Sequence, residues 1–137
     1  MADITVTAAN VQPGTGAVID KRYNFGGTVT AGQAVYLDLT TNTWKPADND
    51  SSAATAVLGG VALNGGASGQ PAAVLTGGNY NPGGTVVAGT IYCLSSTAGG
   101  ICPAADLGSG DTVAILGVAT SASNINVQLH NSGGAIS

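Results

Sequence analysis

A ten-residue segment occurs twice in this chain, and this repetition is the strongest constraint on how the chain folds. Residues 23–32 read YNFGGTVTAG and residues 80–89 read YNPGGTVVAG, so that eight positions are identical and the two leading tyrosines lie 57 residues apart. Pro46-Ala47 recurs as Pro103-Ala104 at the same spacing. The sequence therefore predicts a tandem duplication of one unit of ~57 residues.

Each copy of the repeated segment is followed by the pattern of a β-hairpin. Val35, Leu37 and Leu39 alternate with other residue types, as expected for a strand with one buried face, and a turn rich in Thr and Asn follows. In the second copy, the apolar residues 91–94 and 101–103 flank a small, polar turn. The two Gly-Gly pairs of the repeated segment are expected to supply positive φ angles at tight turns.

These patterns predict an all-β protein in which the two units form one compact domain, similar to a sandwich or a barrel. The first unit spans residues 23–79 and the second spans residues 80–137, whereas residues 1–22 precede them without a counterpart. Residues 111–119 form a nearly continuous apolar run, which is typical of a strand covered on both faces.

Residues 1–22 are predicted to form an extended N-terminal arm. Residues 3–8 alternate between polar and apolar types, which indicates a strand with Ile4 and Val6 on one face. Residues 11–16 contain Pro and Gly and are expected to form a loop. Such a segment either adds an edge strand to its own domain or reaches a neighbouring molecule.

Two of the three cations, Lys21 and Arg22, lie where this arm joins the first unit. Together with Ile4 and Val6 they are candidates for contacts with a partner. Because the repeated units do not include the arm, we expect a chain that lacks residues 2–19 to fold and to lose attachment to that partner.

Charged side chains are unusually scarce, at 7% of the residues compared with roughly 25% in an average soluble domain. The net charge of −4 argues against nucleic-acid binding, which needs several cations to replace phosphate counterions. A surface with so few charges has weak protection against self-association. We therefore expect an obligate oligomer or a protein bound in a lattice, with a homotrimer as the leading hypothesis.

The sequence contains no stretch that is long and apolar enough to span a membrane, and its start lacks the basic and apolar regions of a signal peptide. We therefore expect synthesis in a cytoplasm and no membrane partner. Cys93 and Cys102 flank the second hairpin turn, where a disulfide is geometrically possible, but two reduced thiols are favoured without secretion.

No pattern of residues indicates catalysis, a cofactor or a metal. His130 is the only histidine, too few for a zinc site, and no serine is placed on a strained elbow beside it. The seven Asp residues fall mainly in turns. Trp44, the only tryptophan, is expected in the core or at a subunit contact, while sugar stacking is the alternative.

The order of motifs resembles the capsid decoration (cement) proteins of tailed bacteriophages. The resemblance rests on residues 29–32 followed by 58–62, VTAG and LGGVA, and on residues 86–89 followed by 116–119, VVAG and LGVA. It implies a β-rich protein, commonly trimeric, that binds the outside of an expanded capsid and connects neighbouring coat subunits.

Three functions are therefore compared. The first is a structural virion protein on the capsid exterior, with the major capsid protein and further copies of itself as partners. The second is a carbohydrate-binding or fibre module, which predicts exposed aromatic side chains. The third, an enzyme, lacks any recognisable site.

Overall fold

The computed structural model describes residues 3–52 and 54–136, and these residues form an all-β fold, as predicted. Eleven strands belong to one mixed sheet in the order β3-β5-β4-β6-β7-β11-β10-β8-β9, and β1 and β2 both pair with β7. The strands are β1 (Val11–Pro13), β2 (Val18–Asp20), β3 (Asn24–Phe25), β4 (Ala34–Asp38), β5 (Thr43–Pro46), β6 (Gly60–Ala62), β7 (Val74–Pro82), β8 (Ile91–Leu94), β9 (Ile101–Pro103), β10 (Thr112–Ala119) and β11 (Ile125–Ala135). Two 3₁₀ turns, η1 (Ala8–Asn10) and η2 (Ala104–Asp106), complete the fold.

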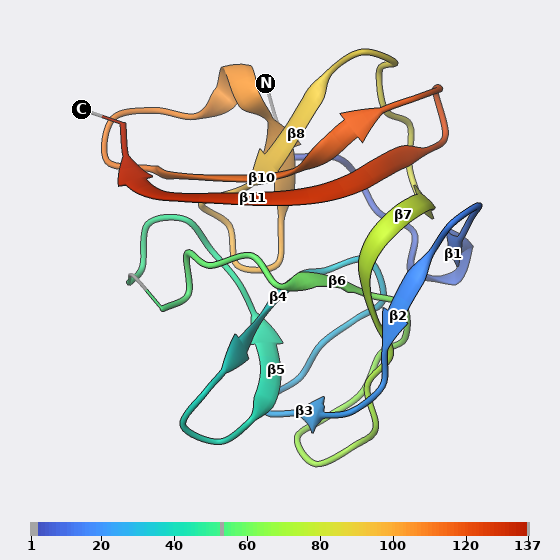
Figure 1. Ribbon diagram of the computed structural model, residues 1–137, viewed down its shortest axis with the longest axis vertical. Helices are drawn as coiled ribbons and strands as arrows, with labels where there is room; N and C mark the ends of the chain where they lie inside the picture. The colour runs from blue at the N-terminus through green and yellow to red at the C-terminus, as the bar shows by residue number, and fades with distance from the viewer. Residues whose placement is uncertain (1–2, 53, 137) are drawn as a thin grey trace.

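Strand β7 divides the sheet into two lobes, which lie one above the other in Figure 1. Its first part, up to Gly77, pairs with β2 and β6, and its second part, from Gly78, pairs with β1 and β11. We call β2–β6 with the first part of β7 the first lobe. The second lobe contains β1, the second part of β7 and β8–β11.

The hairpins of the two lobes have the same pairing register. In the first lobe, Val35 pairs with Pro46 and Ala34 pairs with Val61. In the second lobe, Tyr92 pairs with Pro103 and Ile91 pairs with Val118. Each of these second-lobe residues lies 57 positions after its first-lobe counterpart. Such a shared register is what a duplication predicts, although the duplication itself stays a prediction.

The two copies of the repeated segment differ at their beginning. Asn24–Phe25 form β3, which runs parallel to β5, whereas residues 80–82 end β7 between β1 and β11. Gly83 has a φ of 80°, the turn conformation expected from the sequence. Neither Gly26 nor its neighbour has a positive φ, so that expectation is wrong for the first copy. Gly26 is needed for space instead, because a Cβ there would collide with the side chain of Thr43.

Two clusters of buried apolar side chains form the core. The smaller cluster lies within the first lobe and contains Phe25, Val29, Val35, Trp44, Ala62, Ala72 and Val74. The larger cluster combines residues of both lobes: Val11, Ala34, Ala47, Leu58, Val61, Leu75, Tyr80, Val86, Tyr92, Leu94, Ile101, Ala114, Leu116, Ala119, Ile125 and Val127. The first lobe therefore buries one face in its own core and a second face against the second lobe.

Hydrogen bonds join the lobes around the larger cluster. The N–H of Ala34 donates to the carbonyl of Gly99 over 2.9 Å, and the N–H of Gly99 donates to the carbonyl of Ala47 over 2.7 Å. The side chain of Asn131 on β11 makes two bonds with the backbone of Leu58, at 2.8 and 3.0 Å. The turn between β8 and β9 and the strand β11 thus hold the first lobe from two sides.

The N-terminal segment is part of the fold and not a detachable arm. Residues 3–7 belong to no strand, contrary to the sequence prediction, but the N–H of Ile4 donates to the carbonyl of Ile101 and that of Thr7 donates to the carbonyl of Gly83. Ile4 and Val6 are half-buried and pack against the larger core. Burial of their side chains in the chain's own core overturns the expectation of a projecting strand.

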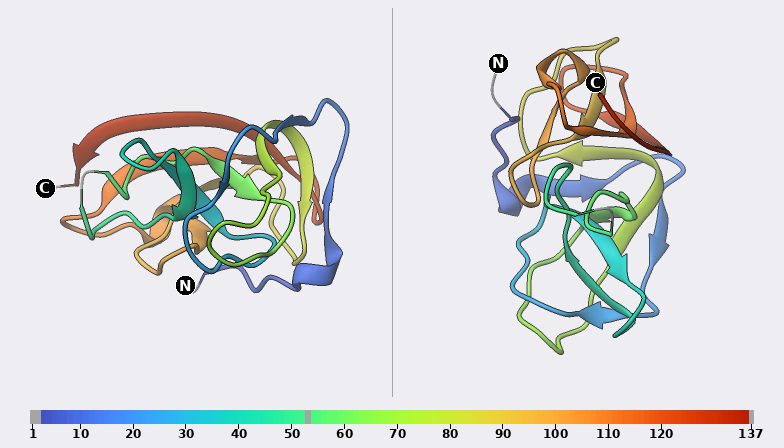
Figure 2. Two further views of the ribbon diagram at one scale, coloured as in Figure 1. Left: turned by 90° about the horizontal axis from the view of Figure 1, so that it is seen from below. Right: turned by 90° about the vertical axis from the view of Figure 1, so that its left-hand side faces the viewer.

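The same segment then crosses from the second lobe to the first, as the blue ribbon in Figure 2 shows. Residues 11–13, expected in a loop, form β1 and pair with residues 80–82 of β7. Strand β2 pairs with the other part of β7. Each lobe therefore receives one strand from the N-terminal segment.

Deletion of residues 2–19 should destabilise the protein strongly, contrary to the expectation from sequence. The deletion removes β1 and most of β2, and it exposes the second lobe's core where Ile4, Val6 and Val11 pack. We expect loss of the cooperative thermal transition in circular dichroism. The matched control, Gln12→Ala on the exposed side of β1, should change the free energy of unfolding by less than about 0.5 kcal/mol. A truncated protein with the native melting temperature would contradict this account.

Tyr80 has a buried hydroxyl group with no hydrogen-bond partner among the described residues. Burial also raises the pKa of this phenol. Because an unpaired buried polar group costs about 1–3 kcal/mol, Tyr80→Phe should leave the free energy of unfolding unchanged or raise it. Urea unfolding monitored by fluorescence measures this, with the half-buried Tyr23→Phe as control. A loss of more than about 1 kcal/mol would mean that the hydroxyl group does have a partner.

Candidate functional site

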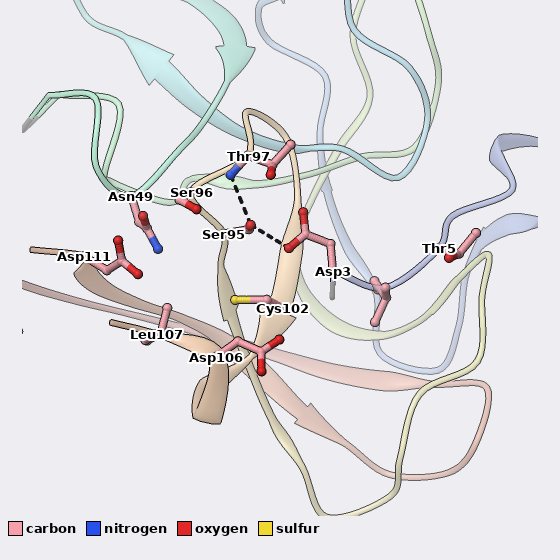
Figure 3. A pocket seen from close by; sticks show the side chains of 11 residues that line it. Asp3, Thr5, Asn49, Ser95, Ser96, Thr97, Cys102, Asp106, Leu107 and Asp111 are labelled. Atoms are coloured by element: carbon pink, nitrogen blue, oxygen red, sulfur yellow. Dashed lines mark hydrogen bonds between the residues drawn. The ribbon is translucent and has the colours of Figure 1, made fainter. Parts of the chain in front are cut away.

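A cavity of about 530 Å³ lies at the end of the second lobe beside the N-terminal segment. Figure 3 shows three carboxylates around it, those of Asp3, Asp106 and Asp111, together with Cys102. The hairpin turn after β8 contributes Ser95, and the loop after β5 contributes a buried asparagine, Asn49. The cavity is therefore acidic.

Neutral donors hold two of these carboxylates. The hydroxyl group of Ser95 donates to Asp3 over 2.6 Å and accepts a bond from the N–H of Thr97. The N–H of Gly108 donates to Asp111 over 2.9 Å. These bonds fix the turns at the rim of the cavity, which is the usual role of Asp and Ser in such turns.

Asn49 connects the two lobes beneath the cavity. Its side-chain amide donates to the carbonyl of Leu94 over 2.8 Å, and its backbone bonds to Ser95 and Thr112. The Oδ1 atom of Asn49 has no donor among the described residues. The cavity therefore offers acceptors, but the described residues contain no group of three or more His, Cys, Asp or Glu that could hold a metal ion.

Cys102 lies directly opposite Cys93 in the pairing of β8 with β9, and both cysteines are buried and free. Burial raises the pKa of both thiols, and the nearby negative charge of Asp3 adds to the effect at Cys102, whose pKa rises to about 12. A thiol with a raised pKa is neutral at pH 7–8. Cys102 is therefore not an activated nucleophile.

Neither thiol should react rapidly with Ellman's reagent at pH 8 while the protein is folded. Since both pKa values lie above that pH, the reactive thiolate is scarce, and burial blocks access to it. In denaturant both thiols should react at once, which serves as the control. Rapid labelling of the folded protein would contradict this prediction, and a disulfide in the non-reducing mass would contradict the free thiols.

The second lobe also has an exposed apolar surface. Ile91 on β8 and Val118 on β10 are direct partners in the sheet, and they are 43% and 42% exposed. The half-buried Ile115 completes what we call the apolar strip, above a hollow of about 220 Å³. Among the described residues, none that lines this hollow is charged, and none also lines the acidic cavity.

The apolar strip was not predicted from sequence. The run at residues 111–119 was interpreted as a strand covered on both faces, but Val118 faces solvent in this protein. The available signal was the alternation of Ile115 and Val118 with the buried Leu116 and Ala119 around a bulge. Alternation assigns side chains to two faces, and it does not say whether the outer face is covered.

The predicted contact residues Lys21 and Arg22 are exposed. Arg22 forms an ion pair with Asp20 at 2.8 Å, and its guanidinium lies 5.2 Å from the ring centre of Tyr23. The pair with Arg22 lowers the pKa of Asp20. Arg22 thus has partners within the first lobe, while Lys21 extends into solvent.

Ile4, Val6 and Trp44 do not offer exposed contacts. Ile4 and Val6 cover the larger core, as described above. Trp44 is only 3% exposed and packs edge-on against Tyr23, with ring centres 6.4 Å apart. A Cβ at Gly59 would collide with the indole ring, so there is no space for a larger residue at this position beside Trp44. As a partner contact, Trp44 is corrected to a core residue.

A scan against models of protein families found no match, and a search of the curated proteins found no similar sequence. Within the described residues no helix is both long and apolar enough to cross a membrane.

Proposed function

We propose that this chain is a structural virion protein that binds the outer surface of a phage capsid and stabilises it by connecting coat subunits. The observation that carries the proposal is the uncovered apolar strip on the second lobe, which suits a protein that works within an assembly. Its proposed partners are the major capsid protein and further copies of itself, in a homotrimer. Synthesis in the host cytoplasm precedes assembly on the capsid exterior.

The scarcity of charge supports the same proposal. A lattice protein exchanges solvent for neighbours over much of its surface, and each buried unpaired charge there would cost free energy. With three cations, of which Arg22 and Lys45 are already paired with aspartates, this chain brings few such charges to a contact.

A carbohydrate-binding role has less support. Sugar sites usually present exposed aromatic rings for stacking, and all six aromatic residues of this chain lie in its described part. None is exposed: Tyr23 and Tyr36 are half-buried, and the other four are buried. Stacking on an open aromatic face therefore has no candidate residue in this protein.

Co-sedimentation with capsids tests the proposal. Heads assembled from the coat protein of the same virus, isolated without this chain, should bind the purified protein to saturation and should then withstand a higher temperature before they disrupt. Heads that already carry their full complement are the matched control and should bind none. The proposal fails if undecorated, expanded heads bind no more protein than decorated ones.

A further inference from the structure

Two residues of the first lobe that correspond to the apolar strip are buried. By the common register, the counterparts of Ile91 and Val118 are Ala34 and Val61, which are fully buried in the larger core. Ile115 aligns with Val57, which is 51% exposed, so the difference between the lobes lies at Ile91 and Val118. The same face is thus covered in one lobe and open in the other.

The second lobe supplies this cover. The turn between β8 and β9 bonds to Ala34 and Ala47 through Gly99, and the buried Leu94 at the start of this turn belongs to the same cluster as Ala34. The face of the first lobe is therefore closed by the turn side of the second lobe.

The turn side of the first lobe has the same construction and lacks such a cover. Leu37 is the counterpart of Leu94, and it is half-buried, whereas Leu94 is fully buried. Leu39, two residues further along the chain, is 78% exposed on the turn between β4 and β5. Each lobe therefore has an open surface that matches a covered surface of the other lobe.

The two hairpin turns also share their conformation. Asn42 and Gly99 lie 57 positions apart and both adopt positive φ, at 54° and 76°. The side chain of Asp38 accepts a bond from the N–H of Thr40. In the second turn, Ser95 does the same for Thr97. The first lobe's turn is therefore preformed in the shape that docks within the chain.

From this correspondence we propose that the apolar strip binds the turn side of the first lobe of a second copy of this chain. The contact brings Ile91 and Val118 of one copy against Leu37 and Leu39 of the next. It repeats between molecules the packing that joins the two lobes within each molecule. This inference rests on the self-association in the proposed function, and it does not depend on attachment to a capsid.

Charge presents no obstacle to this contact. The charged side chains beside the receiving turn are Asp38 and Lys45, which pair with each other at 2.7 Å. Beside Tyr23, Arg22 pairs with Asp20. The hollow of the apolar strip has no charged lining residue. No unpaired charge among these groups has to be buried when the surfaces meet.

The contact is head-to-tail, because it joins two different surfaces. Repeated contacts of this kind form a closed ring when the rotation between copies closes, and a filament otherwise. A homotrimer of two-lobed chains would be a ring of lobes in which every strip is covered. The proposal thus names residues for the contact between copies in the homotrimer.

Single charge substitutions on each surface test this contact. Val118→Asp places a charge in the strip, and Leu39→Asp places one on the receiving turn. Each variant should sediment as a monomer at concentrations where the unmodified protein is a ring, with an unchanged circular dichroism spectrum. Val87→Asp is the matched control, since Val87 is 63% exposed and belongs to neither surface, and it should still form the ring.

Mixing distinguishes a head-to-tail contact from a symmetric one. The Leu39→Asp variant keeps an intact strip and the Val118→Asp variant keeps an intact turn, so an equimolar mixture should form a 1:1 complex although neither variant self-associates. If Leu39→Asp assembles normally, or if the mixture stays monomeric, the contact does not join these surfaces. If the unmodified protein itself sediments as a monomer and still binds capsids, self-association is overturned and attachment stands.

Discussion

The rest of the structure depends on one packing contact, the burial of the first lobe's outer face under the second lobe. Without this contact the larger core would lose its wall of Ala34, Leu58, Val61 and Leu75, since these residues close it from the first-lobe side. Strand β7 makes the contact possible because it continues from one lobe into the other. At the point where it changes partners, Gly78 has a φ of 89°, and a Cβ there would collide with the backbone of Gly16. Neither lobe is therefore an independent folding unit, although each has its own hairpin.

The N-terminal segment reinforces that contact from outside. It bonds to the second lobe near Ile101 and Gly83 and then pairs along β7 with both lobes in turn. A segment that closes the edge of a sheet within its own molecule has used its main-chain hydrogen bonds and its apolar side chains. This is why Ile4 and Val6 contribute to stability and cannot also serve as free anchors for a partner. Contacts with other molecules have to come from surfaces that the fold leaves open.

Sequence could predict the local structure and much of its arrangement. The alternation and the turn residues of the chain are local signals, and they gave the all-β class, both hairpins and the spacing at which pairing recurs. The N-terminal segment was misjudged because β1 depends on distant residues of β7, which local pattern does not contain. The apolar strip was misjudged for a related reason. Whether an apolar side chain is covered depends on how the lobes pack. The two lobes of this chain share one sequence pattern but have different neighbours.

The difference between the two lobes also explains how an uncovered face remains tolerable before assembly. In the first lobe the pairing continues from Val61 to Leu75, and both are fully buried. In the second lobe the corresponding partner of Val118 is Asn126, which is polar and half-buried. The amide in place of an apolar residue reduces the apolar area that is exposed beside Val118 before assembly. The strip is thus polar towards β11 and apolar towards β8, where the turn of the next copy is proposed to dock. Docking at the apolar end buries Ile91 and Val118, and it leaves the amide at the edge, where solvent can satisfy it.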